Sequence, residues 1–133
     1  MRKSNRGFTL IEIMIVVAII GIVITIAAPS YTEYLAKGRR GEIAGILSEQ
    51  AQNLERFYSK NNVYTGVTGL STGNTYYTIT PTITAQTFLL TAVRNAGATM
   101  ASDKCGDFTI TNTGVRSMVN ATAGLTTKYC WGR

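Results

Sequence analysis

The first strong pattern in the chain is an apolar run from Phe8 to Ala28 that contains no lysine or arginine. At about 1.5 Å per residue, a helix of these residues is about 31 Å long, which matches the hydrocarbon core of a bilayer. A basic segment precedes the run, so positive charge would hold residues 1–7 on the cytoplasmic side. The pattern therefore predicts a membrane-spanning helix over 8–29, with the rest of the chain outside.

Beyond Pro29 the apolar residues recur at intervals of three and four, which predicts an amphipathic helix over 30–60. The predicted apolar stripe consists of Tyr31, Tyr34, Leu35, Ile43, Ile46, Leu47, Ala51, Leu54, Phe57 and Tyr58. The charged residues, Arg40 among them, fall largely on the other faces. We expect one long helix that is kinked at Pro29 and that packs its second half on a folded domain.

The period changes to two in residues 61–133, after a glycine-rich loop over 61–75. The predicted strands lie at Tyr77–Ile83, Phe88–Val93, Phe108–Thr111 and Val115–Val119. The residues Thr-Asn-Thr-Gly at 111–114 are typical of a hairpin turn, and Pro81 indicates a strand end, a bulge or a sheet edge. The tail from Ala123 has no periodicity. The expected fold class is α+β, a long N-terminal helix packed on a small antiparallel sheet of about four strands.

The charge of the chain gives only weak support for a nucleic-acid or anionic-membrane partner. The formal net charge is +6, but Arg2, Lys3 and Arg6 precede the apolar run, and without them the excess of basic residues is three. The sequence contains no histidine and only two cysteines, which disfavours most metal sites and histidine-dependent catalysis. We expect no enzymatic activity, no metal and no cofactor.

The two cysteines, Cys105 and Cys130, allow two interpretations of their redox state. In a chain that an apolar N-terminus sends into or across a membrane, they fit one disulfide formed in an oxidising compartment. A bridge that closes the 24 residues between them would add about 3 kcal/mol by loop-entropy reasoning. The alternative is a pair of buried free thiols in a cytosolic protein.

The apolar run also has a simpler reading as a cleaved secretory signal. Such signals have a shorter apolar stretch followed by small residues at the cleavage site. Ala27 and Ala28 supply small residues, but Pro29 directly after them is a poor context for cleavage. The membrane helix is therefore the preferred reading.

The N-terminus resembles that of the type IV pilins and of the related type II secretion pseudopilins. The match is carried by the residues Gly-Phe-Thr-Leu-Ile-Glu at 7–12, the short basic leader before them and the unbroken apolar run that ends at Pro29. The segments 61–65 (NNVYT), 101–106 (ASDKCG) and Cys130-Trp131 are similar to small minor pilins of the PilE-like and competence group. The resemblance covers the whole chain and implies the pilin fold.

The resemblance implies a subunit, minor rather than major, of a filament used for adhesion, twitching motility or DNA uptake. A prepilin peptidase would cleave the leader, residues 1–7, between Gly7 and Phe8 and methylate the new amine of Phe8. The subunit would wait in the inner membrane, with its C-terminus in the periplasm, until an assembly platform packs it with other pilin subunits into an extracellular pilus. Family filaments unwind the stretch that corresponds to Gly21–Pro29, although glycine is also common in membrane helices.

Glu12 is a carboxylate within an apolar segment, where a charge costs about 2.5–3.5 kcal/mol at the helix centre and less near an end. Such a residue is by default functional. The resemblance implies an ion pair with the amine of Phe8 on the preceding subunit during assembly. A simpler reading is an acid that compensates the dipole at the start of its own helix.

A DNA-binding competence pilin is the alternative function. The basic residues that could contact DNA are Arg94, Lys104, Arg116, Lys128 and Arg133. Their spacing shows no cluster, so an ordinary solvated surface is the competing reading. A secretion pseudopilin is a third possibility, but only Asp103 and Asp107 follow Glu55, too few acids for the calcium site that its major members carry.

Overall fold

A computed structural model describes residues 7–132, and these divide into two compact units between Leu35 and Ala36. The elements are α1 (Leu10–Asn61), β1 (Tyr77–Ile83), β2 (Phe88–Arg94), β3 (Asp107–Thr111), β4 (Arg116–Val119) and α2 (Thr127–Trp131). The four strands form one antiparallel sheet in the order β1-β2-β3-β4. The predicted α+β class, with a long helix and four antiparallel strands, is confirmed.

The first unit contains the apolar part of α1. Its large apolar side chains from Leu10 to Ile26 expose between 46% and 81% of their surface, so nothing within the described chain covers them. The mean hydropathy of its most apolar stretch is 3.0, and by length and composition this helix could cross a membrane. Helical structure continues through both Gly21 and Pro29.

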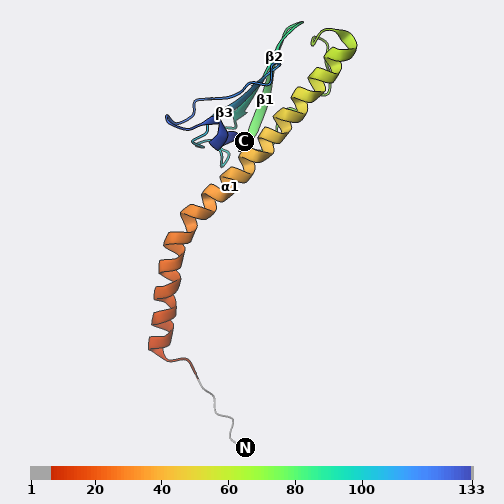
Figure 1. Ribbon diagram of the computed structural model, residues 1–133. Helices are drawn as coiled ribbons and strands as arrows, with labels where there is room; N and C mark the ends of the chain where they lie inside the picture. The colour runs from red at the N-terminus through yellow and green to blue at the C-terminus, as the bar shows by residue number, and fades with distance from the viewer. Residues whose placement is uncertain (1–6, 133) are drawn as a thin grey trace, which may run out of the picture. The chain divides into compact units, whose positions relative to one another are not determined.

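The second unit has its own core on one face of the remaining part of α1. Ile43, Leu47 and Leu54 are fully buried at helical spacing and belong to one apolar cluster with the inward-facing residues of the strands. These inward-facing residues include Tyr77, Ile79, Leu90, Ala92, Phe108 and Ile110. Figure 1 shows the sheet beside this yellow part of α1.

The predicted apolar stripe of the second half-helix is wrong in three places. Tyr31 and Tyr34 are not buried, since they expose 63% and 74% of their surface. Arg40, which we placed off the stripe, is buried. Helical periodicity identified the buried face, but it could not say where along the helix the packing begins or which polar residue has a buried partner.

Pro81 occupies the free edge of the sheet, one of its three predicted locations. Earlier in β1, the N–H of Ile79 donates to the carbonyl of Thr72 and the carbonyl of Tyr77 accepts from Asn74. These bonds cover that part of the edge with the segment before the strand. Because alternate residues direct their backbone groups to the same edge, position 81 would present the next N–H, and proline has none. The edge is thereby protected against pairing with another strand.

Two glycines are required where the backbone passes close to itself. A Cβ on Gly73 would lie 2.1 Å from the carbonyl oxygen of Tyr77, and one on Gly106 would lie 2.2 Å from that of Val119. Gly106 also has a φ of 70°, a conformation that favours glycine. Gly106 therefore lets the chain turn into β3 directly after the disulfide cysteine.

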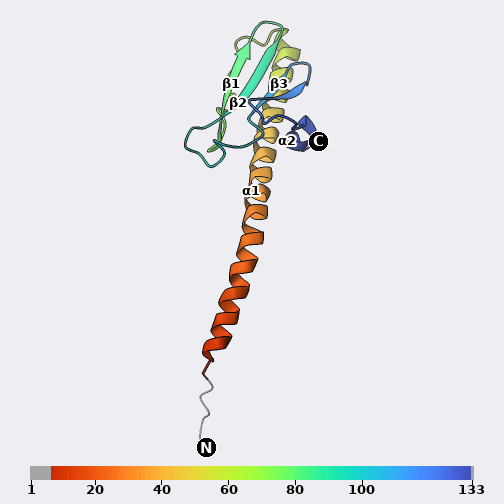
Figure 2. The ribbon, with the colours of Figure 1, turned by 90° about the vertical axis from the view of Figure 1, so that its left-hand side faces the viewer.

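The tail forms a helix of five residues, α2, which the missing periodicity did not predict. Thr126 caps it through its side chain, which accepts a hydrogen bond from the N–H of Tyr129. Trp131 covers the edge of the sheet at β4, because its indole N–H donates to the carbonyl of Ser117 over 3.1 Å. Figure 2 shows α2 close to the helix α1 and to the C-terminus. A helix this short is too brief for a 3.6-residue period to appear in the sequence.

Candidate functional site

Gly7 and Phe8, which the sequence singled out, are exposed and precede the helix α1. Gly7, Phe8 and Thr9 have no regular structure, and Phe8 exposes 81% of its surface. The junction between Gly7 and Phe8 is thus open to another protein.

Thr9 and Glu12 form a reciprocal cap at the start of α1. The N–H of Glu12 donates to the Thr9 hydroxyl over 3.3 Å, and the N–H of Thr9 donates to the Glu12 carboxylate over 3.4 Å. This is the arrangement of a capping box, which satisfies backbone donors that a helix start leaves without partners. Sequence reasoning missed this role of Thr9, although the spacing Thr-x-x-Glu is its known signal.

Cys105 and Cys130 form a disulfide with a Cα–Cα distance of 5.7 Å. It joins the segment before β3 to α2. Both cysteines are buried, beside the edge-to-face pair of Phe108 and Trp131, whose ring centroids lie 5.4 Å apart.

Two arginine–aspartate pairs hold the segment on either side of Cys105. The Arg40 guanidinium reaches from α1 to the Asp103 carboxylate with N–O distances of 2.9 and 2.5 Å, and the two side chains expose only 2% and 5% of their surface. Arg94 on β2 pairs with Asp107 over 3.0 Å and also donates to the carbonyl of Asp103. The only two aspartates of the chain are therefore paired inside the fold.

Asp107 is held in its charged form by its hydrogen bonds. Burial alone would raise the pKa of this carboxyl. The backbone N–H of Arg94, the amide of Asn120 and the Arg94 guanidinium donate to it, and together they hold its pKa below its usual range.

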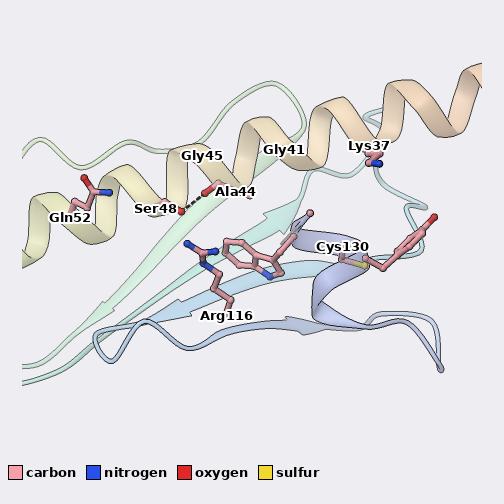
Figure 3. Close-up of a pocket in the computed structure, with 11 residues that line it drawn as sticks. Lys37, Gly41, Ala44, Gly45, Ser48, Gln52, Arg116 and Cys130 are labelled. Carbon is pink, nitrogen blue, oxygen red and sulfur yellow. Dashed lines mark hydrogen bonds between the residues drawn. The ribbon is translucent and has the colours of Figure 1, made fainter.

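Four basic residues gather around α2, and we call Lys37, Lys104, Arg116 and Lys128 the α2 basic region. Lys37 of α1 and Arg116 of β4 line opposite sides of one open cavity of about 470 Å³, together with Tyr129 and Trp131 (Figure 3). Lys128 lies in α2 itself. The fold thus brings together charges that the sequence spacing left scattered.

The aromatic residues of α2 carry three of the nearby cations on their ring faces. The Lys104 ammonium lies 5.0 Å from the Tyr129 ring centre, and the Arg116 guanidinium lies 5.4 Å from that of Trp131. The buried Arg40 guanidinium lies 5.7 Å from the Tyr129 ring centre. Such cation–π contacts orient the charges without neutralising them.

Of the two remaining predicted DNA contacts, the structure describes only Arg94. Arg94 is half-buried and is committed to Asp107 and the carbonyl of Asp103. Arg133 lies outside the described residues. Within residues 7–132, no group of three or more acidic, cysteine or histidine side chains is placed to hold a metal ion.

The profile of a family described as "Type IV minor pilin ComP, DNA uptake sequence receptor" matches residues 29–109. The chain belongs to this family of type IV pilins. A second profile, "Prokaryotic N-terminal methylation motif", matches residues 2–28 of the pilin. The two matches together cover the apolar helix and most of the packed unit.

Curated relatives match the pilin over part of its length. Fimbrial protein EcpC of Eikenella corrodens is 39% identical over 64 residues, which are 48% of this chain and 42% of that protein. Type IV major fimbrial protein FimA of Dichelobacter nodosus is 50% identical over 52 residues, which are 39% of this chain and 31% of that protein. The matched region thus spans less than half of the length of these relatives.

Two solved structures resemble the pilin over most of their length. A type IV pilin from Shewanella oneidensis is 34% identical with a TM-score of 0.54, covering 68% of this chain and 98% of that one. The non-core minor pilin PilV of Neisseria meningitidis has a TM-score of 0.57 at 23% identity, covering 70% and 98% of the two chains. The likeness to PilV concerns the fold alone.

Proposed function

We propose that this pilin is a structural subunit, a minor pilin, of a type IV pilus that serves adhesion, twitching motility or DNA uptake. The observation that carries the proposal is the apolar half of α1, whose side chains are exposed on every side. A helix of this kind must be covered by lipid or by other helices. Exchange between these surroundings costs little because both are apolar, so the same helix serves as anchor and as filament core.

Processing would begin at the exposed Gly7–Phe8 junction. A prepilin peptidase cleaves there and methylates Phe8, which the match to the methylation motif supports. The mature subunit then rests in the inner membrane with its C-terminus in the periplasm, and an assembly platform adds it to the filament with other pilin subunits. In the filament, the stretch from Gly21 to Pro29 loses helical hydrogen bonds.

Glu12 would act in assembly as the partner of the Phe8 amine of the preceding subunit. In the isolated chain its carboxylate accepts the N–H of Thr9 over 3.4 Å, one residue from that amine in its own chain. An exposed and long contact of this kind is readily exchanged for a full positive charge in an apolar setting. The Glu12 carboxylate would thus first accept the N–H of Thr9 in the capping box and then pair with the Phe8 amine of the preceding subunit.

Two substitutions of Glu12 separate the two roles. Glu12→Gln keeps an oxygen that can accept the Thr9 N–H but removes the charge, whereas Glu12→Ala removes both. We expect both variants to be cleaved and both to be depleted from sheared filaments, measured by immunoblot against the cell-bound pool. Wild-type incorporation of Glu12→Gln would contradict the ion pair and leave the cap as the role of Glu12.

DNA binding is a second candidate function, supported by the α2 basic region. Asp103, the residue before Lys104, pairs with Arg40, and Asp107 pairs with Arg94. The family description, "DNA uptake sequence receptor", agrees with this chemistry. Basic side chains that neutralise phosphates supply sequence-independent affinity with a strong dependence on salt.

The test uses a fragment of residues 36–133, which is a compact unit with its own core, and double-stranded DNA at several salt concentrations. Lys104→Ala with Lys128→Ala is expected to weaken binding and to reduce the salt slope by about 2. Arg56→Ala with Lys60→Ala is the matched control, since both residues are exposed and lie near the end of α1. Equal losses in both pairs, or no binding at low salt, would contradict this function.

A further inference from the structure

Tyr31 and Tyr34 form an exposed aromatic pair just beyond the apolar run of α1. They expose 63% and 74% of their surface, and a spacing of three residues places them on neighbouring positions of one helix face. Helical periodicity placed them on the predicted apolar stripe, but both are exposed. Two large, largely apolar side chains therefore need another environment.

The helix places this pair at a definite distance from the other end of the span. The helix begins at Leu10, 21 positions before Tyr31, which is about 32 Å at 1.5 Å per residue. The hydrocarbon core of a bilayer is about 30 Å thick. A helix with its apolar run centred in that core puts the tyrosines at the lipid–water boundary.

The residues between the two ends carry almost no polar groups. Thr25 is the only polar side chain from Ile13 to Pro29, and its hydroxyl donates to the carbonyl of Ile22 over 2.7 Å. Immediately beyond the span, the Thr32 hydroxyl donates to the carbonyl of Pro29 over 2.9 Å. The tyrosines are thus the first residues after the run whose side chains combine a large apolar ring with a polar group, the phenol hydroxyl.

We propose that Tyr31 and Tyr34 bind the lipid headgroup boundary on the periplasmic side of the membrane and set the depth of the unassembled pilin. Tyrosine is enriched at this boundary because its ring is apolar and its hydroxyl bonds to water and headgroups. The inference rests on the membrane-anchored state in the proposed function. It adds a lipid-binding pair that holds the packed unit at the surface before assembly.

The experiment measures depth by fluorescence quenching of the full chain in phosphatidylcholine vesicles, with bromine placed on the lipid chain either near the headgroup or near the chain end. Tyr31→Trp and Tyr34→Trp are compared with Ile19→Trp, a position 12 residues earlier and near the middle of the run. The wild-type chain gives the signal of its single native Trp131, which is subtracted. We expect the shallow label to quench the two boundary tryptophans more strongly and the deep label to quench the Ile19→Trp variant more strongly.

The variants distinguish failure of this inference from failure of the proposed function. If the deep label quenches Ile19→Trp and neither label quenches the boundary variants above the wild-type signal, the lipid-binding pair is refuted while the anchor stands. Stronger quenching of the boundary variants by the deep label would also refute it. If no variant is quenched, the membrane anchor itself fails.

A second measurement tests whether the pair sets the depth. In the Ile19→Trp background, Tyr31→Leu with Tyr34→Leu extends the apolar run, so the span should slide and carry the introduced tryptophan away from the bilayer centre. We expect quenching by the deep label to fall, whereas Thr32→Ala on the same turn leaves it unchanged. Unchanged quenching in the leucine variant would overturn the depth-setting role.

Discussion

The two parts of α1 share a backbone geometry but obtain their stability from different sources. Residues 10–35 use hydrogen bonds within the helix, and their apolar side chains are covered by nothing in the described chain. The part of α1 from residue 36 onward is held by a core, by the buried pair of Arg40 and Asp103 and, through the sheet, by a disulfide. The difference is that the first part leaves its apolar surface exposed, whereas the second part buries its own apolar face in a core.

The largest effect is expected at the buried ion pair of the packed unit. Asp103→Ala leaves the Arg40 guanidinium buried without its carboxylate, which should lower the free energy of unfolding by about 3–5 kcal/mol. Urea unfolding of the 36–133 fragment measures it. The double variant Arg40→Met with Asp103→Leu should recover most of this loss; a double variant as unstable as Asp103→Ala would contradict the electrostatic cause.

A matched pair of truncations in the two parts of α1 tests the comparison directly. Leu47→Ala removes a fully buried side chain and should lower the free energy of unfolding by about 2–5 kcal/mol. Ile15→Ala, 54% exposed, should leave the unfolding of the packed unit in the full chain, followed by its tryptophan fluorescence, unchanged. A comparable loss in Ile15→Ala would show that the two units are energetically coupled.

Acid should weaken the packed unit through Asp107. Its pKa is held below the usual value of 3.8 in the fold, so the stability it contributes is complete above that value and is lost as the pH falls through the folded pKa. Asp107→Asn should be less stable at neutral pH and show a flatter dependence on pH below about 4, measured by urea unfolding at a series of pH values. Parallel curves would contradict this role of Asp107.

The smallest effect, and a gain, is expected at Tyr77. Its hydroxyl is buried without a hydrogen-bond partner, and burial raises the pKa of this phenol well above its usual range. Tyr77→Phe should raise the free energy of unfolding by about 1 kcal/mol, because an unsatisfied buried group is removed. Tyr64→Phe is the control that should lose stability, since the Tyr64 hydroxyl donates to Glu55 over 2.8 Å; a loss in Tyr77→Phe would mean that its hydroxyl has a partner in solution.

Much of the fold was predictable because its elements have strong local periods. The apolar run, the helical stripe at Ile43, Leu47 and Leu54, and the alternation in the four strands each repeat often enough to be recognised. The helix α2 was missed because five residues contain little more than one turn. Arg40 was misplaced because a charged residue on a buried face is explained only by its partner Asp103, 63 positions away.

The residues of the candidate site also differ in whether the sequence alone could predict their role. The Gly7–Phe8 junction, Glu12 and Pro29 lie within one continuous segment, so their spacing is meaningful without the fold, and Thr9 could have joined them through the Thr-x-x-Glu spacing. The α2 basic region could not be recognised, because its members come from α1, the segment before β3, β4 and α2. Arg94 was included among the predicted DNA contacts only because it is basic. Its ion pair with Asp107, which the sequence did not predict, distinguishes it from the basic residues around α2.

By itself, the sequence determined the properties that depend on neighbours along the chain: an apolar span of membrane length, its acidic start, the amphipathic continuation and the alternating strands. The tertiary structure decided which charges are buried in pairs and which gather around α2, that Pro81 lies at the free edge of the sheet, and that Tyr31 and Tyr34 stay exposed. The physical reason is that local periodicity records which face of an element is apolar, whereas burial and charge pairing depend on residues that only the folded chain brings together.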